Sequence, residues 1–181
     1  FSFCSAWYFA FSSLTISSPD KAQEMIIKLS EYLRYSLSNE NEQVTTLARE
    51  IANIKLYLEI EKIRFGSRLN FELNCNEECL TALIPAMILQ PLFENAIKHG
   101  VYESLDTINI ILGGRKIGDE LKLVLTNNFD ASARQVKGGR IGLKNTQERL
   151  FLIYRRRDLL VTEKIEDTFM VTIKIPQDEK N

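Results

Sequence analysis

Few residues in this sequence belong to the types on which metal-binding, disulfide-rich or nucleic-acid-binding proteins depend. Its 181 residues include one histidine and three cysteines, Cys4, Cys75 and Cys79. This odd and sparse set has no ligand pairing at zinc spacing, and it is typical of reduced thiols in a cytosolic compartment. The 23 basic residues are nearly cancelled by 24 acidic ones, so the charge predicts no nucleic-acid-binding face.

Long hydrophobic runs are also missing. Residues 1–11 are strongly apolar and aromatic, but this stretch is too short to span a bilayer and no basic segment precedes it. The sequence does not begin with methionine, so we expect it to be a fragment of a longer protein. We expect no direct membrane contact from this fragment.

Two segments near the start have helical periodicity. Residues 18–20, Ser-Pro-Asp, predict the start of a first helix, and a second helix is predicted from Thr45 or Thr46. The apolar positions that repeat along them are Ile26, Leu29, Leu33 and Leu37, and then Leu47, Ile51, Ile54 and Leu58. The short polar connection predicts an antiparallel hairpin whose two apolar seams need partners. Pairing with a second copy in a four-helix bundle would cover them, as would packing of both helices on the rest of a monomer.

Gly66 marks a predicted boundary between this hairpin, residues 1–66, and a second domain, residues 67–181. Periodicity predicts strands at 69–73, 107–112, 121–125, 161–165 and 169–175, and helices at 85–99 and 141–154. The inward-facing positions of the later helix are Leu143, Leu150 and Ile153. Residues 113–119 are predicted to form a turn region and residues 128–140 a mobile loop. The expected fold class is α+β, a helical hairpin followed by a two-layer α/β sandwich with helices on one face.

Residues 89–100, Leu-Gln-Pro-Leu-Phe-Glu-Asn-Ala-Ile-Lys-His-Gly, hold the most concentrated chemistry of the chain. On a helix, Asn95, Lys98 and His99 share one face, which Glu94 borders. An amide oxygen is a suitable ligand for Mg²⁺, lysine and histidine can neutralise phosphate oxygens, and a glutamate can act as a base. Together these groups could hold a metal–triphosphate and activate a nucleophile. The alternative is that Asn95 caps a carbonyl and Glu94 forms an ion pair with Lys98 worth about 0.3 kcal/mol.

Three blocks of sequence, in order, resemble the LytS-like sensor histidine kinases, which belong to the wider group of ATPases that includes gyrase, Hsp90 and MutL. Residues 89–100 resemble the N-box of that family. Residues 47–51 and 57–65 resemble its second helix, and residues 141–150 resemble its ATP-lid and the helix that follows. The order and spacing fit over residues 12–176, which is nearly the whole chain.

The resemblance implies the cytoplasmic kinase core of a two-component sensor histidine kinase. Such a core binds ATP with Mg²⁺ and transfers the γ-phosphoryl group to a histidine, from which it passes to a response regulator. It would form a homodimer through residues 19–65, and the parent protein is expected to be anchored in the cytoplasmic membrane. The alternative function is a non-catalytic nucleotide-binding dimerisation module, which is a degenerate kinase.

The resemblance also implies roles for individual residues of the N-box block. Asn95 would bind the Mg²⁺ that bridges the ATP phosphates, and Glu94 would be the catalytic group that polarises the nucleophile. Lys98 and His99 would lie on the phosphate side, with one of the two expected to point to solvent.

Two further segments would complete the nucleotide site. Asn127, at the end of a predicted strand, would accept a hydrogen bond from the adenine amino group where the family has an aspartate. A turn-forming role for Asn127 and Asn128 is equally open. Arg149 is expected to be a structural anchor outside the site. The residues of the glycine-rich lid that would contact the nucleotide are Gly138, Gly139, Arg140, Gly142, Leu143 and Asn145.

The family's phosphoacceptor histidine has no recognisable counterpart here. Counting back without gaps places Ser2 at the histidine position and Phe1 at the preceding proline, and only Phe3 agrees. The one histidine of the chain, His99, belongs to the N-box block. Three accounts fit: the parent is a degenerate kinase, the first dozen residues do not represent the native sequence, or Ser2 accepts phosphate.

Overall fold

The computed structural model describes residues 2–38, 42–101, 106–129 and 140–177. The helices are α1 (Ser2–Ser17), α2 (Pro19–Ser38), α3 (Leu47–Phe65), η1 (Gly66–Arg68), α4 (Glu77–Leu80), α5 (Gln90–Gly100) and α6 (Arg140–Tyr154). The strands are β1 (Val44–Thr46), β2 (Leu69–Cys75), β3 (Leu83–Pro85), β4 (Ile108–Ile117), β5 (Glu120–Asn128), β6 (Leu160–Ile165) and β7 (Thr168–Pro176).

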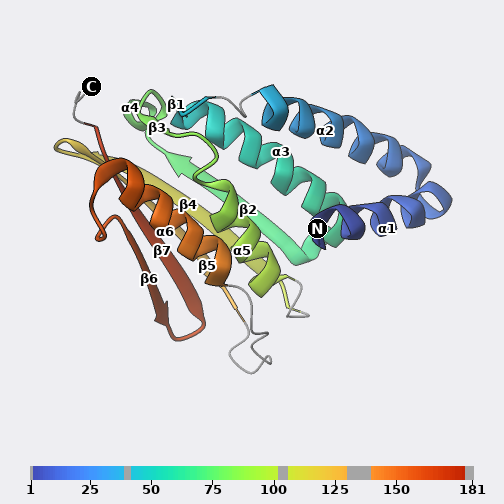
Figure 1. The fold of residues 1–181 in the computed structure, drawn as a ribbon. Coiled ribbons are helices and arrows are strands. Elements are labelled where there is room, and N and C mark those ends of the chain that lie inside the picture. The colour runs from blue at the N-terminus through green and yellow to red at the C-terminus, as the bar shows by residue number, and fades with distance from the viewer. Residues whose placement is uncertain (1, 39–41, 102–105, 130–139, 178–181) are drawn as a thin grey trace.

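A five-stranded sheet forms one layer of the fold, in the order β2-β4-β5-β7-β6. β2 pairs with β4 in parallel, whereas the other neighbours are antiparallel, so the sheet is mixed. α5 and α6 lie side by side over one face, and α3 packs next to β2 (Figure 1). This arrangement confirms the predicted α+β class with helices on one face.

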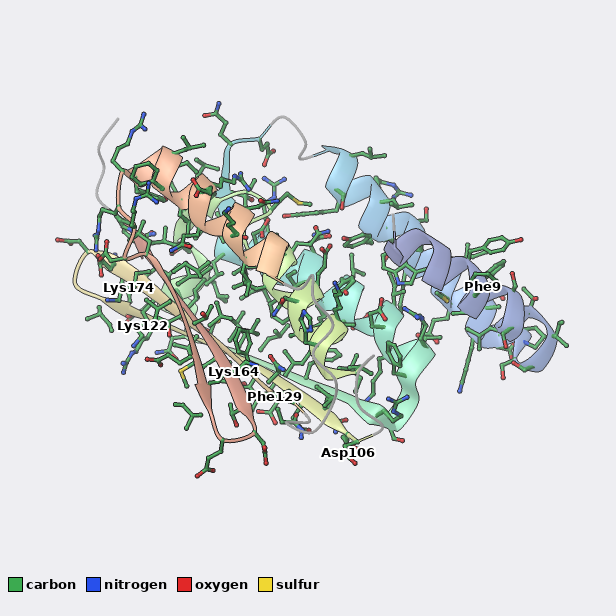
Figure 2. All side chains as sticks on the ribbon, turned by 60° about the horizontal axis from the view of Figure 1, so that its bottom comes forward. Phe9, Asp106, Lys122, Phe129, Lys164 and Lys174 are labelled. Atoms are coloured by element: carbon green, nitrogen blue, oxygen red, sulfur yellow. The ribbon has the colours of Figure 1, made fainter. Side chains whose placement is uncertain are left out.

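Strand residues alternate between the two faces of the sheet. The face toward α5 and α6 is apolar and buried, as Ile110 and Leu112 of β4 illustrate. The opposite face carries polar side chains such as Lys122 and Lys174, which are register partners on β5 and β7 (Figure 2). One buried and one hydrated face is the usual state of an antiparallel sheet, which is why period-two alternation in the sequence predicts these strands.

The helical part contains one element that periodicity did not predict. The apolar residues near the start form part of α1, and Trp7 of this helix is buried against α2 and α3. Its ring centroid lies 5.7 Å from that of Tyr32 and 6.2 Å from that of Tyr57. Its Nε1 donates a hydrogen bond to Glu61 Oε1 at 2.7 Å. α1 is therefore joined to the protein core by aromatic contacts and one buried hydrogen bond.

The two predicted apolar seams of the hairpin differ in burial. On α3, Leu47 and Leu58 are fully buried in the core that also contains the sheet residues. On α2, Leu33 and Leu37 remain 46% and 69% exposed. The α3 seam thus packs on the α/β part, as the monomer alternative predicts. On α2, Leu29 packs against the core, while the rest of the predicted seam is exposed in the described part of the chain. The domain boundary at residue 66 stays a prediction.

The helix predicted over residues 85–99 begins five residues later, at Gln90. Residues 83–85 form β3 instead, because they pair in an antiparallel manner with β1. Between β3 and α5, Met87 has φ of 58°, which interrupts any helix at that point. Pro91 lies in the first turn of α5, where proline needs no intrahelical N–H. A short apolar run fits a strand or a helix equally, and the pairing with β1 decides here.

The turn predicted over residues 113–119 is also shorter than expected. β4 continues to Ile117, and the connection to β5 consists only of Gly118 and Asp119. Gly118 has φ of 57°, which a two-residue hairpin turn requires at its first position. Gly114 lies within β4 at a point where a side chain would not fit, because a Cβ there would stand 2.7 Å from Cys75 Sγ.

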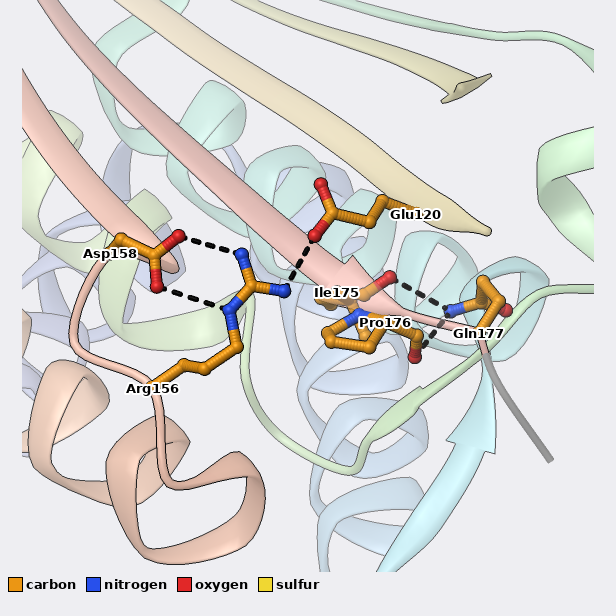
Figure 3. Close-up of polar contacts among 6 residues, drawn as sticks. All are labelled: Glu120, Arg156, Asp158, Ile175, Pro176 and Gln177. Atoms are coloured by element: carbon orange, nitrogen blue, oxygen red, sulfur yellow. Dashed lines mark hydrogen bonds and ion pairs between the residues drawn. The ribbon is translucent and has the colours of Figure 1, made fainter. Parts of the chain in front are cut away.

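Polar side chains connect the ends of the sheet to neighbouring segments. Arg156, after α6, binds Asp158 at 2.6 Å and Glu120 at 2.7 Å, which ties the α6–β6 connection to the start of β5 (Figure 3). Gln177, after β7, donates from Nε2 to the carbonyl of Leu83 at 3.0 Å and accepts from its N–H at 3.2 Å. The two Gln177 hydrogen bonds attach the small β1–β3 pair to the end of β7 in the main sheet.

Candidate functional site

The four candidate residues of the N-box block, Glu94, Asn95, Lys98 and His99, are all on α5. Phe93 and Ile97 bury one side of this helix in the core, which fixes the directions of the other side chains. Asn95 is the one polar residue among the buried residues of α5, with 9% of its surface exposed. The half-buried residues beside it are Glu94, Lys98 and His99. The helix thus brings an amide, a carboxyl and two basic groups to the border between core and surface.

The side chain of Glu94 accepts a hydrogen bond from a residue of its own helix. Gln90 Nε2 donates a hydrogen bond to Glu94 Oε1 at 2.8 Å. Burial raises the pKa of the Glu94 carboxyl above its ordinary value, although the Gln90 hydrogen bond opposes the shift. Among the ion pairs between described residues, none joins Glu94 to Lys98, so the simple i, i+4 pair is not formed. A carboxyl with a raised pKa is suited to proton transfer.

Asn127 and Asn128 end β5 and have different surroundings. Asn128 bonds to the start of β4, since its Nδ2 donates to Thr107 O at 3.0 Å and its Oδ1 accepts from Asn109 N at 2.7 Å. Asn127 is 3% exposed, and its Nδ2 donates to Asn128 O at 3.0 Å. That bond uses the amide nitrogen of Asn127, so its side-chain oxygen is the group that would accept from a base. Asn128 has the structural role, and Asn127 remains the candidate for adenine.

Phe129 follows directly after the last residue of β5. Its N–H donates to Asp167 O at 2.9 Å, and Lys164 Nζ lies 4.7 Å from the centroid of its ring (Figure 2). The end of β5 is thus attached to the turn between β6 and β7.

The start of α6 lies against the start of α5. A Cβ on Gly142 would stand 3.8 Å from Pro91 Cβ, which is ordinary contact. Thr146 is buried, and its hydroxyl donates to Gly142 O at 3.0 Å. Arg140 is the first residue of α6, and Asn145 is exposed. Gly138 and Gly139 lie outside the described residues.

Two of the three inward-facing residues predicted for α6 are buried. Leu143 and Leu150 belong to the core, as expected, but Ile153 is 48% exposed, so that part of the prediction was wrong. Three residues of helix advance by 300°, which places Ile153 about 60° away from the direction of Leu150.

The donor groups fit Mg²⁺ that is carried by phosphates. No group of three or more His, Cys, Asp or Glu side chains that could hold a metal ion occurs in the described part of the chain. Asn95 instead supplies one hard oxygen atom on α5. Mg²⁺ often takes only one or two protein ligands and completes its shell with water and substrate phosphates. The N–H groups at the start of a helix have no intrahelical partners, and those at the start of α6 are suited to bind phosphate oxygens.

Sequence reasoning missed Glu50 and gave Arg149 only a structural role. Glu50 of α3 is 1% exposed and accepts hydrogen bonds from Met87 N and Leu89 N, at 2.7 and 3.3 Å. Arg149 Nη1 donates to Ala86 O at 2.6 Å, which confirms that it is an anchor. In the sequence, the available signal for Glu50 was an acidic residue at a position of the helix that is buried.

Burial raises the pKa of Glu50 and Glu61, as it does for Glu94. The backbone hydrogen bonds to Glu50, and the guanidinium of Arg64 beside Glu61, oppose this effect without reversing it. A carboxyl whose pKa is higher in the folded protein than in the unfolded chain, about 4.3 for Glu, favours folding when it is protonated. Its contribution is complete below the unfolded pKa and is lost as the pH rises through the folded pKa.

We therefore expect the melting temperature to rise as the pH is lowered from 8 toward 5. Glu61→Gln should make this rise smaller, because the substitution removes one of the three titrations. Scanning calorimetry at half-unit pH steps measures both curves. Asp158, whose pKa is lowered to about 2, loses its contribution only in much stronger acid. A melting temperature that falls steadily below pH 8 would contradict the prediction.

Among helices of the described residues, none has the length and apolar character needed to cross a bilayer.

Comparison with known proteins gives consistent results. A family model described as histidine kinase matches residues 9–69. The sensor histidine kinase YpdA of Escherichia coli is 30% identical over 154 residues, which cover 80% of this chain and 27% of YpdA. The sensor protein LytS of Staphylococcus haemolyticus is 29% identical over 179 residues, which cover 91% of this chain and 30% of LytS. The chain thus spans less than a third of the length of these relatives.

Solved structures resemble the fold. The catalytic domain of the histidine kinase ThkA superposes with a TM-score of 0.55, and the match covers 74% of this chain and 94% of that domain. Its sequence identity is 15%, so this similarity concerns the fold alone.

Proposed function

This chain belongs to the LytS-like sensor histidine kinases, and we propose that it is the ATP-binding and dimerising core of such a kinase. The proposed activity is transfer of the γ-phosphoryl group of Mg²⁺–ATP to a histidine, for relay to a response regulator. A kinase of this family that binds nucleotide without transferring phosphate is the second candidate, because the sequence has no recognisable acceptor histidine.

One observation supports the nucleotide site above the others. Asn95 is a buried amide on α5, and the start of α6 packs against the same helix through Gly142 and Pro91. A metal ligand and a helix N-terminus therefore approach one region from two elements that are far apart in sequence. Both features bind anions or their counter-cations, and packing of the core requires neither of them.

The roles of the side chains follow from their chemistry. Bound ATP with Mg²⁺ supplies the phosphoryl group and a cation that offsets its charge. Asn95 would hold that cation through its side-chain oxygen, and Lys98 and His99 would offset the charge of the phosphate oxygens. When the unprotonated nitrogen of the acceptor imidazole bonds to the γ-phosphorus, the bond from that phosphorus to the bridging oxygen of ATP breaks and ADP leaves. Glu94 accepts the proton from the other ring nitrogen, for which its raised pKa makes it suited. Positioning and charge neutralisation then account for catalysis, as in other phosphoryl transfers.

Calorimetric titration of the 181-residue chain with ATP tests the site. Binding is expected with Mg²⁺ present and is expected to weaken when EDTA removes the metal. No heat of binding in either condition would overturn the proposal.

Asn127 is proposed to set the preference for adenine. Asn127→Ala should weaken ATP binding and reduce discrimination between ATP and GTP, because a buried acceptor that pairs with the adenine amino group is lost. Asn128→Ala is the matched control, since Asn128 bonds only to the protein backbone in the contacts given above and should affect stability rather than preference. Competition titrations with the two nucleotides measure the ratio. An unchanged ratio in Asn127→Ala would assign Asn127 to the turn alone.

Incubation with γ-labelled ATP separates the two candidate functions. A phosphoryl group on histidine is a phosphoramidate and is labile in acid, whereas phosphoserine is a stable ester. Acid-labile label on a longer chain that contains an acceptor histidine supports transfer. ATP binding without such label supports the non-catalytic module.

Dimerisation, partner and location are proposed on the same basis. The exposed apolar stripe on α2, which contains Ile26, Leu33 and Leu37, supports a homodimer through residues 19–65. A response regulator is the proposed receiver of the phosphoryl group. The chain is proposed to act in the cytoplasm as part of a membrane-anchored parent, as expected for sensor kinases of this family.

A further inference from the structure

Glu50 connects α3 to the turn that precedes α5. It lies in the first turn of α3, and its carboxylate accepts the N–H of Met87 at 2.7 Å and that of Leu89 at 3.3 Å. Both oxygens are used, since Met87 binds Oε1 and Leu89 binds Oε2. A single side chain of the helical hairpin therefore holds two successive points of the connection between β3 and α5.

The backbone of this turn needs such an external partner. Met87 has φ of 58°, a conformation that non-glycine residues rarely adopt. Leu89 occupies the N-cap position of α5, and no side-chain hydrogen bond caps this helix. Leu89 is also fully buried, so water cannot replace a lost partner for its N–H. The carboxylate of Glu50 thus takes the place of a capping side chain.

α6 also contacts this turn, through the side chain of Arg149. Arg149 Nη1 donates to Ala86 O at 2.6 Å, and the charge of Arg149 lowers the pKa of Glu50 against the larger effect of burial. The turn at residues 86–89 is therefore held by α3 through a carboxylate and by α6 through a guanidinium. Those two contacts lie directly before the helix that carries Asn95.

Glu61 is a second buried carboxylate of α3, and its structural role makes it a comparison for Glu50. It is fully buried, accepts from Trp7 Nε1 at 2.7 Å and pairs with Arg64 at 2.8 Å. Burial raises its pKa, as for Glu50. Its described partners belong to α1 and α3, and none belongs to α5 or α6. Glu61 therefore matches Glu50 in charge, burial and helix but differs in what it holds.

We propose that Glu50 is a positioning residue for the nucleotide site. By fixing the turn at residues 86–89, it sets where α5 begins relative to α6, and so holds Asn95 opposite the start of the lid helix. Because Glu50 belongs to the hairpin, the same contact makes nucleotide affinity sensitive to the position of α3. This inference rests on the proposed nucleotide-binding function.

Glu50→Gln and Glu61→Gln, compared in the full 181-residue chain, test the inference. Each substitution preserves side-chain shape and removes one buried charge. If the neutral side chain leaves the turn correctly formed in about a tenth of molecules, the apparent dissociation constant for Mg²⁺–ATP rises about tenfold. Calorimetry, carried out well below each melting temperature, should show this loss for Glu50→Gln and less than about a twofold change for Glu61→Gln. Hydrogen exchange without nucleotide should be faster at residues 87–95 only in Glu50→Gln.

The outcomes separate the two ideas. Equal ATP affinity in Glu50→Gln and wild type, with unchanged exchange at residues 87–95, overturns the role of Glu50 and leaves the nucleotide site intact. Equal losses in both variants also overturn it, because the effect would then follow from buried charge in α3 generally. If wild type itself binds no ATP, the proposed function fails and the positioning role falls with it.

Discussion

Asn95→Ala is expected to weaken Mg²⁺–ATP binding by about 10- to 150-fold in calorimetric titration. The substitution removes the one buried polar side chain of α5 and, with it, the proposed oxygen ligand of Mg²⁺. Interactions of polar groups with a charge contribute about 1.5–3 kcal/mol each, and 1.4 kcal/mol corresponds to a tenfold change in affinity. The effect should depend on the metal, so that wild type and variant become similar in EDTA.

Two further variants make this prediction specific. Asn95→Asp keeps an oxygen at the same place and is expected to retain metal-dependent binding, because carboxylates are common ligands of Mg²⁺. Asn109→Ala is the control: the Asn109 side-chain oxygen accepts from Asn70 at 3.2 Å on the exposed side of β2 and β4, away from α5. Equal affinity of wild type and Asn95→Ala in Mg²⁺ would remove the basis for the metal site.

Leu33→Glu is expected to convert the proposed homodimer to monomers, with a dissociation constant raised at least about 100-fold. The apolar stripe on α2 is exposed in the single chain, and a symmetric dimer would bury it against its own copy. A glutamate there would be desolvated twice, once in each subunit, and an unpaired buried charge costs several kcal/mol. Sedimentation equilibrium over a range of protein concentrations measures the change.

A matched leucine tests whether the location matters. Leu152 is 63% exposed, more than Leu33, and belongs to α6, which lies apart from α2 (Figure 1). Leu152→Glu should leave self-association unchanged. If Leu152→Glu disrupts the dimer and Leu33→Glu does not, the interface lies on the α/β part and the proposal for α2 is wrong.

Much of the fold could be predicted from the local periodicity of apolar and polar residues. The strands near residues 69–73, 107–112, 121–125 and 169–175 were found because each buries one face, which imposes a period of two. The strand at 161–165 was also found, although its residues are all exposed. The helices that became α3 and α6 were found because each buries a stripe, and α2 was found from a stripe of apolar residues that stays largely exposed. The errors in the bounds of elements lie at segments with no period of their own. Residues 83–89 are an apolar run that became β3 and a turn, and residues 113–117 contain two glycines that β4 accommodates.

The candidate site divides in the same way. Glu94, Asn95, Lys98 and His99 could be grouped from spacing alone, because one helix supplies all four. The approach of Gly142 to Pro91, and the different surroundings of Asn127 and Asn128, depend on contacts between elements far apart in sequence. Spacing along the chain carries no information about such contacts.

The amino-acid sequence by itself determined the kinase family, the α+β class and the polar face of α5, because each depends on residue types at short, regular separations. Only the tertiary structure decided that the α3 seam is buried within the monomer while the α2 seam is not, and that Glu50 and Arg149 meet at one turn. The physical reason is that a side chain's burial and its hydrogen-bond partners are properties of the assembled core, in which residues 37 or more positions apart come into contact.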